Sequence, residues 1–158
     1  MPWRMLAGPL YNVVAGLVDS SRDPVWPKVG SVLYCDLLFG YMEHSGIYIG
    51  NNKIVHLAGN GKIETVSPKG FMQGGSGCNI YVSCRDKFSV GSEAAARRAK
   101  KSIGSSRNYN FLLDNCHQFS TGCLTGNFNN SSSFLWMLKD ESAKELESDN
   151  WRYWKIEN

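Results

Sequence analysis

A cysteine and a histidine stand side by side in the segment DNCHQF, residues 114–119, and two more histidines, His44 and His56, lie earlier in the chain. A cysteine thiolate is a strong nucleophile. A neighbouring histidine can take its proton as a base and later protonate the leaving group, while a second polar group fixes the tautomer of that histidine. Cys116, one histidine and an orienting partner are therefore a minimal set for acyl transfer.

The segment around Cys116 has the pattern of a helix start. Asp114 or Asn115 can cap a helix that runs to Gly122 or Gly126. In the first turn of a helix, free backbone N–H groups and the positive end of the helix dipole stabilise a thiolate. We therefore expect the pKa of Cys116 to lie below that of an ordinary cysteine.

His117 is adjacent to Cys116 and competes with the other histidines as the base. Neighbouring helical residues diverge by roughly 100° around the axis. We therefore predict that the His117 ring does not face Cys116 and that it lies at the surface or packs at the helix end.

The segment HSGIYIGNNKIVHLA, residues 44–58, predicts a β-hairpin with a turn centred on Asn51 and Asn52. A two-residue loop would send His44 and His56 to opposite faces and split the apolar side chains between them. A three-residue loop, residues 50–52, gathers the apolar side chains on one face: Ile47, Ile49, Val55 and Leu57.

The apolar pattern therefore selects the three-residue loop, and the two histidines then share the other face. His56 lies opposite Gly46 in that register, and His44 is its diagonal neighbour at about 7–8 Å, which two imidazoles can bridge. We expect Gly46 to leave the space between the two rings open.

Further strands are predicted over residues 29–39, 63–66 and 79–84, and further helices over 92–104 and 133–148, capped by Ser92 and Ser133. These patterns predict an α+β fold in which an antiparallel β-sheet packs against helices. We expect a peripheral N-terminal segment, 1–28, whose apolar part is an amphipathic surface helix, a catalytic domain, 29–126, and a C-terminal helix and tail, 127–158, on the same domain. Aromatic residues in that tail are expected to cover a core edge.

Composition narrows the class of protein. With 42% hydrophobic and 20% charged residues, the 158-residue chain is long enough for one globular core. The five cysteines are odd in number and form no CxxC motif, which favours a reducing, cytoplasmic location and no structural metal. The net charge of +3 and the short basic run at 97–101 indicate a solvated helix face and no specific nucleic-acid partner.

The order of these elements resembles the lecithin retinol acyltransferase family. The resemblance covers residues 29–126 and rests on HSGIYIGNNKIVHL, with its histidines twelve positions apart, followed by Asn115-Cys116. It implies a fold similar to a circularly permuted, papain-like cysteine hydrolase of the NlpC type. By the resemblance, Cys116 is the nucleophile, His44 the base and His56 the group that orients His44.

The implied reaction moves a fatty acyl group from a phospholipid to the thiol, and then to water, an amine or a hydroxyl, without a cofactor. Peripheral contact with a membrane surface is consistent with such a substrate. This chain departs from the family in two ways: His117-Gln118 follow the cysteine where an acidic residue and a histidine are usual, and no apolar run matches the C-terminal anchor of the best-known members.

Three alternatives stay open at this point. The same thiol chemistry serves a cysteine peptidase or amidase of the cell-wall endopeptidase type. A non-catalytic interaction module with this fold would leave Cys116 no more reactive than Cys35 or Cys123. A zinc site formed by Cys116, His44 and His56 is the least favoured, since no spacing motif supports it.

Overall fold

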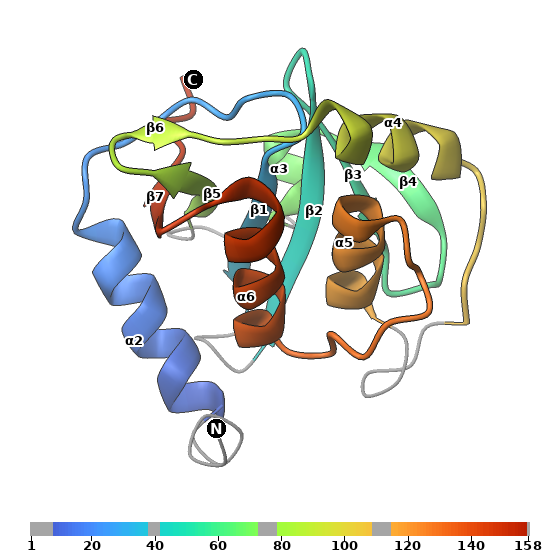
Figure 1. The fold of residues 1–158 in the computed structure, drawn as a ribbon, viewed down its shortest axis with the longest axis horizontal. Coiled ribbons are helices and arrows are strands. Elements are labelled where there is room, and N and C mark those ends of the chain that lie inside the picture. The colour runs from blue at the N-terminus through green and yellow to red at the C-terminus, as the bar shows by residue number, and fades with distance from the viewer. Residues whose placement is uncertain (1–7, 38–41, 73–78, 109–114, 158) are drawn as a thin grey trace.

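The computed structural model describes residues 8–37, 42–72, 79–108 and 115–157. Its elements are α2 (Gly8–Ser20), β1 (Val32–Leu37), β2 (Met42–Gly50), β3 (Lys53–Leu57), β4 (Ile63–Val66), α3 (Pro68–Phe71), β5 (Ile80–Arg85), β6 (Phe88–Ser89), α4 (Glu93–Ser102), α5 (Cys116–Thr125), α6 (Leu135–Leu146) and β7 (Asn150–Tyr153). The strands form one antiparallel sheet in the order β4-β3-β2-β1-β5-β6, with β7 also paired to β5. The predicted α+β class, with helices packed on an antiparallel sheet, is confirmed (Figure 1).

Two apolar cores lie on the two faces of the sheet. The larger one joins the sheet to α4, α5 and α6, which lie together on one face in Figure 1. It contains the hairpin side chains Ile47, Val55 and Leu57 and the α5 side chains Phe119, Cys123 and Leu124. The smaller core lies on the other face and contains Phe71 of α3 and Trp154 after β7. Because side chains alternate along a strand, each strand of the hairpin sends alternate residues into each core.

The β2–β3 hairpin has the predicted register in its interior and a different turn. Ile47 pairs with Val55 and Tyr48 with Ile54, as the apolar pattern requires. Gly50 pairs with Lys53, so the loop has two residues, and a bulge at Ile49 restores the register. The predicted three-residue loop is therefore wrong in detail. Asn51 and Asn52 adopt left-handed conformations, with φ of 51° and 54°, which suit a tight hairpin turn.

The other predicted elements are largely confirmed, with exceptions that pairing and packing explain. Strands β1, β4 and β5 and helices α4, α5 and α6 form where expected. Ser92 caps α4, but α6 begins at Leu135 with Phe134 as an N-cap that makes no side-chain bond, so the predicted Ser133 cap is wrong. The short α3 and strands β6 and β7 were not predicted. In β7, Trp151 is buried against the larger core, as expected for an aromatic tail.

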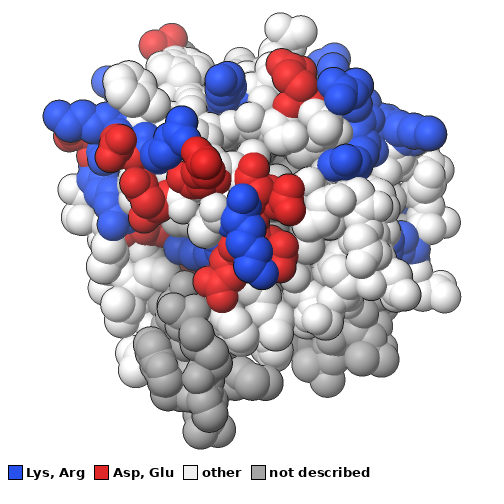
Figure 2. Space-filling view, in the orientation of Figure 1, with Lys and Arg blue, Asp and Glu red and all other residues white. Residues whose placement is uncertain are grey.

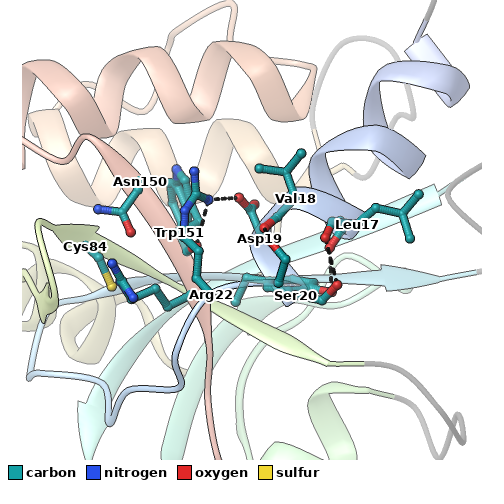
Figure 3. A network of polar contacts seen from close by, with 12 residues as sticks. Leu17, Val18, Asp19, Ser20, Arg22, Cys84, Asn150 and Trp151 are labelled. Atoms are coloured by element: carbon teal, nitrogen blue, oxygen red, sulfur yellow. Dashed lines mark hydrogen bonds and ion pairs between the residues drawn. The ribbon is translucent and has the colours of Figure 1, made fainter.

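Helix α2 is fixed to the sheet by polar contacts at its C-terminal end. Asp19 accepts hydrogen bonds from Lys139 Nζ at 2.9 Å and from the Tyr34 hydroxyl at 2.5 Å. Arg22 joins Asp19 to the backbone oxygen of Trp151, at 2.7 and 3.2 Å (Figure 3). Gly16 allows close contact, since a Cβ there would lie 2.6 Å from an Asp36 carboxylate oxygen. The predicted surface helix therefore has a defined orientation.

The basic run of α4 is only partly solvated. Figure 2 shows a group of Lys and Arg side chains over α4, with mixed charges elsewhere on the upper part of this face. Arg98 does not lie on the predicted solvated face: it donates to the backbone oxygens of Cys123 and Leu124 at 2.8 and 3.2 Å. These carbonyls end α5, where a cation also interacts favourably with the helix dipole. No helix among the described residues is long and apolar enough to cross a membrane.

Candidate active site

The thiol occupies the first position of α5, which a complete capping box holds in place. The Asn115 side chain accepts hydrogen bonds from the N–H groups of His117 and Gln118, and the Gln118 side chain accepts one from the N–H of Asn115. Of the two predicted cap residues, Asn115 is the cap, while Asp114 lies outside the described residues. The helix ends at Gly126, whose φ of 82° is left-handed, as predicted for one of the two glycines.

His44 and His56 are brought together as the hairpin register predicted. Nε2 of His44 is hydrogen-bonded to Nδ1 of His56, and the ring centroids lie 4.7 Å apart. Nε2 of His56 lies 3.3 Å from a carboxylate oxygen of Glu64, its direct partner on β4. Both imidazoles are buried. The hairpin and β4 thus form a chain of contacts from His44 through His56 to Glu64.

The space beside Gly46 is filled, contrary to our expectation. A Cβ on Gly46 would lie 3.0 Å from a ring carbon of Phe71 and 2.8 Å from the backbone oxygen of Val55. The Phe71 ring lies 4.9 Å from the His44 ring and 5.9 Å from the His56 ring. Gly46 therefore admits an aromatic ring that packs both imidazoles, and nothing in the local sequence indicated that α3 would supply it.

The thiol lies where β2 extends beyond its neighbour. By the observed register Leu57, the last residue of β3, falls opposite Ser45, so the first residues of β2 continue past β3. Sγ of Cys116 lies 4.0 Å from the backbone oxygen of Glu43 in this part of β2. Against the effect of burial, the interactions with His117 and then His44 lower the pKa of Cys116, and Cys116 in turn acts weakly to raise the pKa of His56. The three residues predicted from sequence therefore share one electrostatic site.

His117 also faces the thiol, so its predicted position was wrong. Its Nδ1 lies 3.9 Å from Sγ of Cys116 and 2.8 Å from the Ser45 hydroxyl, and its Nε2 lies 3.3 Å from a carboxylate oxygen of Glu43. The residue is 3% exposed. The side chains of Cys116 and His117 leave the helix axis in different directions, as expected for adjacent residues. Because α5 packs on β2, however, contacts with Glu43 and Ser45 keep the His117 ring beside the sulfur.

The predicted low pKa of Cys116 agrees with its surroundings. Burial alone would raise the pKa of this thiol, but the charges of His117 and His44 outweigh it and hold the pKa well below the usual value. Burial raises the pKa of Cys84 to about 11 and that of Cys123 to about 12. Of the thiols compared, only the one at the start of α5 has cationic partners strong enough to reverse the effect of burial.

Burial and the neighbouring His44 lower the pKa of His56 to about 4, so His56 is neutral at neutral pH. Burial also acts to lower the pKa of His117, but the negative charge of Cys116, a hydrogen bond to it and the Glu43 carboxylate outweigh burial and raise this pKa to about 10. Burial thus dominates the pKa of His56, whereas the anionic neighbours of His117 dominate its pKa, although both rings are buried.

Cys116 is 2% exposed. Segments 38–41 and 109–114, which precede β2 and Asn115 in the sequence, lie outside the described residues. No group of three or more metal-ligating side chains in the described part of the chain is arranged to hold a metal.

Glu43, Ser45 and Glu64 are site residues that sequence reasoning missed. A partial signal was available for the first two: alternation along β2 puts them on the face of Ile47, although only packing decides that the start of α5 lies over them.

Comparison with known proteins assigns the family. A comparison with curated protein sequences finds no match. The model of the family described as lecithin retinol acyltransferase matches residues 26–129, about two thirds of the chain. The chain therefore belongs to the lecithin retinol acyltransferase family, and this membership indicates an acyltransferase-like enzyme.

Proposed function

We propose that this protein is a thiol-dependent acyl hydrolase or acyltransferase that acts through Cys116, His44 and His56 and through a thioester on Cys116. The observation that carries the proposal is that His44 interacts with the Cys116 thiol at the start of α5, while His56 is hydrogen-bonded to His44. A packing role for these residues would not require a thiol whose anionic form is stabilised against its own burial.

We infer a tautomer for each histidine of the proposed triad from these contacts. A neutral His56 can accept at Nδ1 only if it carries its proton on Nε2, which then donates to Glu64. His44 must therefore donate through Nε2–H, which leaves the lone pair of Nδ1 to exchange a proton with the sulfur. His56 acts as the orienting group for His44 in this arrangement.

The reaction then follows from these positions. The thiolate of Cys116 attacks the carbonyl carbon of an acyl ester, and a tetrahedral intermediate forms. When the C–O bond breaks, protonated His44 gives its proton to the leaving alkoxide and the acyl group stays on sulfur as a thioester. His44 next takes a proton from water, an amine or a hydroxyl, which attacks the thioester and restores the thiolate.

The start of α5 offers a donor for the oxyanion of that intermediate. The Asn115 side chain uses the N–H groups of His117 and Gln118. Of the first-turn donors, this leaves the N–H of Cys116 for the oxyanion, where the helix dipole adds favourable charge.

A phospholipid acyl ester is the substrate class that we favour, because α2 carries an exposed aliphatic face. Residues 8–18 contain no charged side chain, and one helical face presents Leu10, Val13, Val14, Leu17 and Val18 to solvent, with Leu10 at 64% and Leu17 at 66% exposure. A monomeric protein rarely exposes such a continuous apolar face without a partner. We propose that this face lies in a lipid surface and brings the enzyme to its substrate.

Intact-mass measurement with phosphatidylcholine vesicles tests the substrate class. The expected result is a fatty-acyl adduct and release of lysophospholipid, both absent in Cys116→Ala and both kept in Cys123→Ala, the matched control on the same helix. Equal lipid turnover by wild type and Cys116→Ala, or none by wild type, would overturn the lipid proposal. Cleavage of a cell-wall peptide that depends on Cys116, in the absence of lipid turnover, would establish the amidase alternative.

Vesicle sedimentation tests the role of α2. The double variant Val14→Glu/Leu17→Glu is expected to lose most of its binding to phosphatidylcholine vesicles, because two charges would enter the hydrocarbon boundary. Phe88→Glu is the matched control, since Phe88 is 76% exposed on β6 and outside α2. Equal binding by the double variant and the control would contradict a lipid-facing α2.

A further inference from the structure

Two separate chains of polar contacts converge on the sulfur of Cys116, and the proposed triad uses only one of them. The second runs through His117, whose ring lies between the thiol on one side and Glu43 and Ser45 on the other. The Ser45 hydroxyl is in turn 3.0 Å from that of Ser120, one turn along α5. All these groups come from β2 and α5, the two elements that also carry His44 and Cys116.

The two chains differ in the faces of β2 from which they come. His44 alternates with Glu43 and Ser45 along the strand, so its ring lies with Phe71 on the side of the smaller core. Glu43 and Ser45 point toward α5 and meet His117 there. The thiol, beside the backbone of Glu43, is thus approached by one imidazole from each face of the sheet.

The two imidazoles that approach the thiol have different neighbours. His117 faces a carboxylate at its Nε2, and Glu43 is itself largely buried, with 10% side-chain exposure. A buried carboxylate and a buried sulfur on two sides of one ring stabilise the imidazolium, because little water screens their charges. His44 also interacts with the Cys116 sulfur, but its other contacts are a second imidazole and an aromatic ring, which carry no negative charge.

We propose that His117, held by Glu43 and Ser45, is a permanently protonated imidazolium that keeps Cys116 as a thiolate, while His44 alone carries the protons of the reaction. His117 contacts the reacting sulfur and Glu43 is a positioning residue that acts through it. The proposal rests on the proposed function insofar as Cys116 is its nucleophile. It assigns stabilisation of the thiolate to His117 and proton transfer to His44, two roles that the triad alone does not separate.

The geometry also explains why His117 is a poor proton carrier. A ring that donates Nε2–H to a carboxylate and shares Nδ1–H between a hydroxyl and a thiolate gains stability from both protons. Loss of either proton would leave a buried acceptor without its donor. No carboxylate among the described residues is shown bonded to His44, which can therefore exchange its Nδ1 proton with less cost.

The pH dependence of alkylation by iodoacetamide tests the proposal without any lipid substrate. Mass spectrometry of the Cys116 peptide gives the alkylation rate between pH 5.5 and 9.5. In wild type the rate should stay near its plateau down to pH 6. In His117→Gln, which keeps polar contacts and loses the charge, the rate at pH 6 should fall about tenfold or more, because each unit of raised pKa removes about tenfold of thiolate below it.

Three further variants separate charge from packing. His117→Lys keeps a cation and loses the ring, and it should recover the rate at pH 6 to within about threefold of wild type. Glu43→Gln should give an intermediate loss at pH 6, since it removes the anion that supports the imidazolium. Glu93→Gln, an exposed acidic residue on α4, is the matched control and should have the wild-type profile.

The deficit of His117→Gln should shrink steadily as the pH rises toward 9.5, because a larger fraction of the Cys116 thiol is then ionised without help from a cation. Superimposed profiles for wild type and His117→Gln would overturn the proposal. An equal loss at every pH would also overturn it, because that would indicate altered packing rather than altered charge.

Nitrogen NMR of the wild-type protein keeps the proposal testable if His117→Gln fails to fold. At pH 7.5 both ring nitrogens of His117 should have the shifts of protonated nitrogens, and a neutral ring would refute the proposal. The alkylation test and the lipid test can fail independently. A protein without lipid activity can still show the His117-dependent alkylation profile, and a protein with lipid activity can lack that profile.

Discussion

His44 and His56 form a hydrogen-bonded pair of imidazoles on one face of the β2–β3 hairpin, with Nε2 of the first bonded to Nδ1 of the second. Their positions depend on the ring of Phe71, which lies within 6 Å of both ring centroids, at 4.9 and 5.9 Å. The pair is thus placed by the hairpin register and kept in place by an aromatic ring from α3.

Gly46→Ala is expected to disturb this pair. The new Cβ would lie 2.8 Å from the backbone oxygen of Val55, which cannot move without the strand, and 3.0 Å from Phe71. Overpacking of this kind costs about 1–3 kcal/mol. Urea unfolding should show that loss, together with slower turnover or alkylation at Cys116. Gly59→Ala is the control, since no atom lies within 4 Å of a Cβ there; an equal effect of the two substitutions would refute this account.

His56→Gln should remove a pH dependence of stability. Burial and His44 lower the pKa of His56 in the folded protein to about 4, against about 6.5 when unfolded. Between these two values the unfolded state binds more protons, so the wild type loses stability as the pH falls from about 6.5 to about 4. The full shift corresponds to about 3 kcal/mol.

The difference in unfolding free energy between wild type and His56→Gln, measured at several pH values, isolates this effect. Asp36 also titrates here, because burial, with Glu43 nearby, raises its pKa to about 6, but it is present in both proteins and cancels in the difference. A difference that does not change between pH 4 and pH 7 would contradict a neutral, buried His56.

Asp19→Asn should weaken the attachment of α2. Lys139 donates to Asp19, and its side chain is only 13% exposed. Removal of one partner of a buried ion pair leaves an uncompensated charge and typically costs about 3–5 kcal/mol. Thermal unfolding and proteolysis after residue 20 measure the loss. Asp23→Asn is the control because Asp23 is exposed, and a similar loss for both variants would show that the buried pair is not the cause.

Arg98→Met should destabilise the end of α5, while Arg97→Met should not. Arg98 donates to the last carbonyls of the helix that carries Cys116, at 2.8 and 3.2 Å, whereas Arg97 is exposed. The lost charged hydrogen bonds and dipole interaction are worth about 1–3 kcal/mol. Chemical unfolding of both variants checks this, and an equal effect would mean that the helix end does not depend on Arg98.

Local patterns predicted the parts of the site that lie within one helix or within one hairpin. Alternation of Ile47, Val55 and Leu57 set the interior register of the hairpin, and that register brought His44 and His56 to one face. Asn115 and Gly126 marked the ends of α5 and so placed Cys116 in its first turn. These signals work because they depend on hydrogen bonds and side-chain directions within a few residues.

The turn of the hairpin and the N-cap of α6 were predicted incorrectly, because neither is decided by the residues next to it alone. A bulge at Ile49 lets a two-residue turn and the favoured register coexist, and the sequence gives no sign of which residue will bulge. Phe134 precedes α6 in place of the better cap Ser133, because tertiary packing of Leu135 and Leu138 fixes where that helix starts.

By itself, then, the sequence determined the nucleophile candidate, the paired histidines, the α+β class and the resemblance to the family, all from spacing along the chain. Only the tertiary structure decided that His117 and Glu43 lie beside the thiol, that Phe71 fills the space at Gly46 and that Arg98 binds the end of α5. Each of these contacts joins elements whose relative placement comes from burying the two apolar cores, and no local pattern contains that placement.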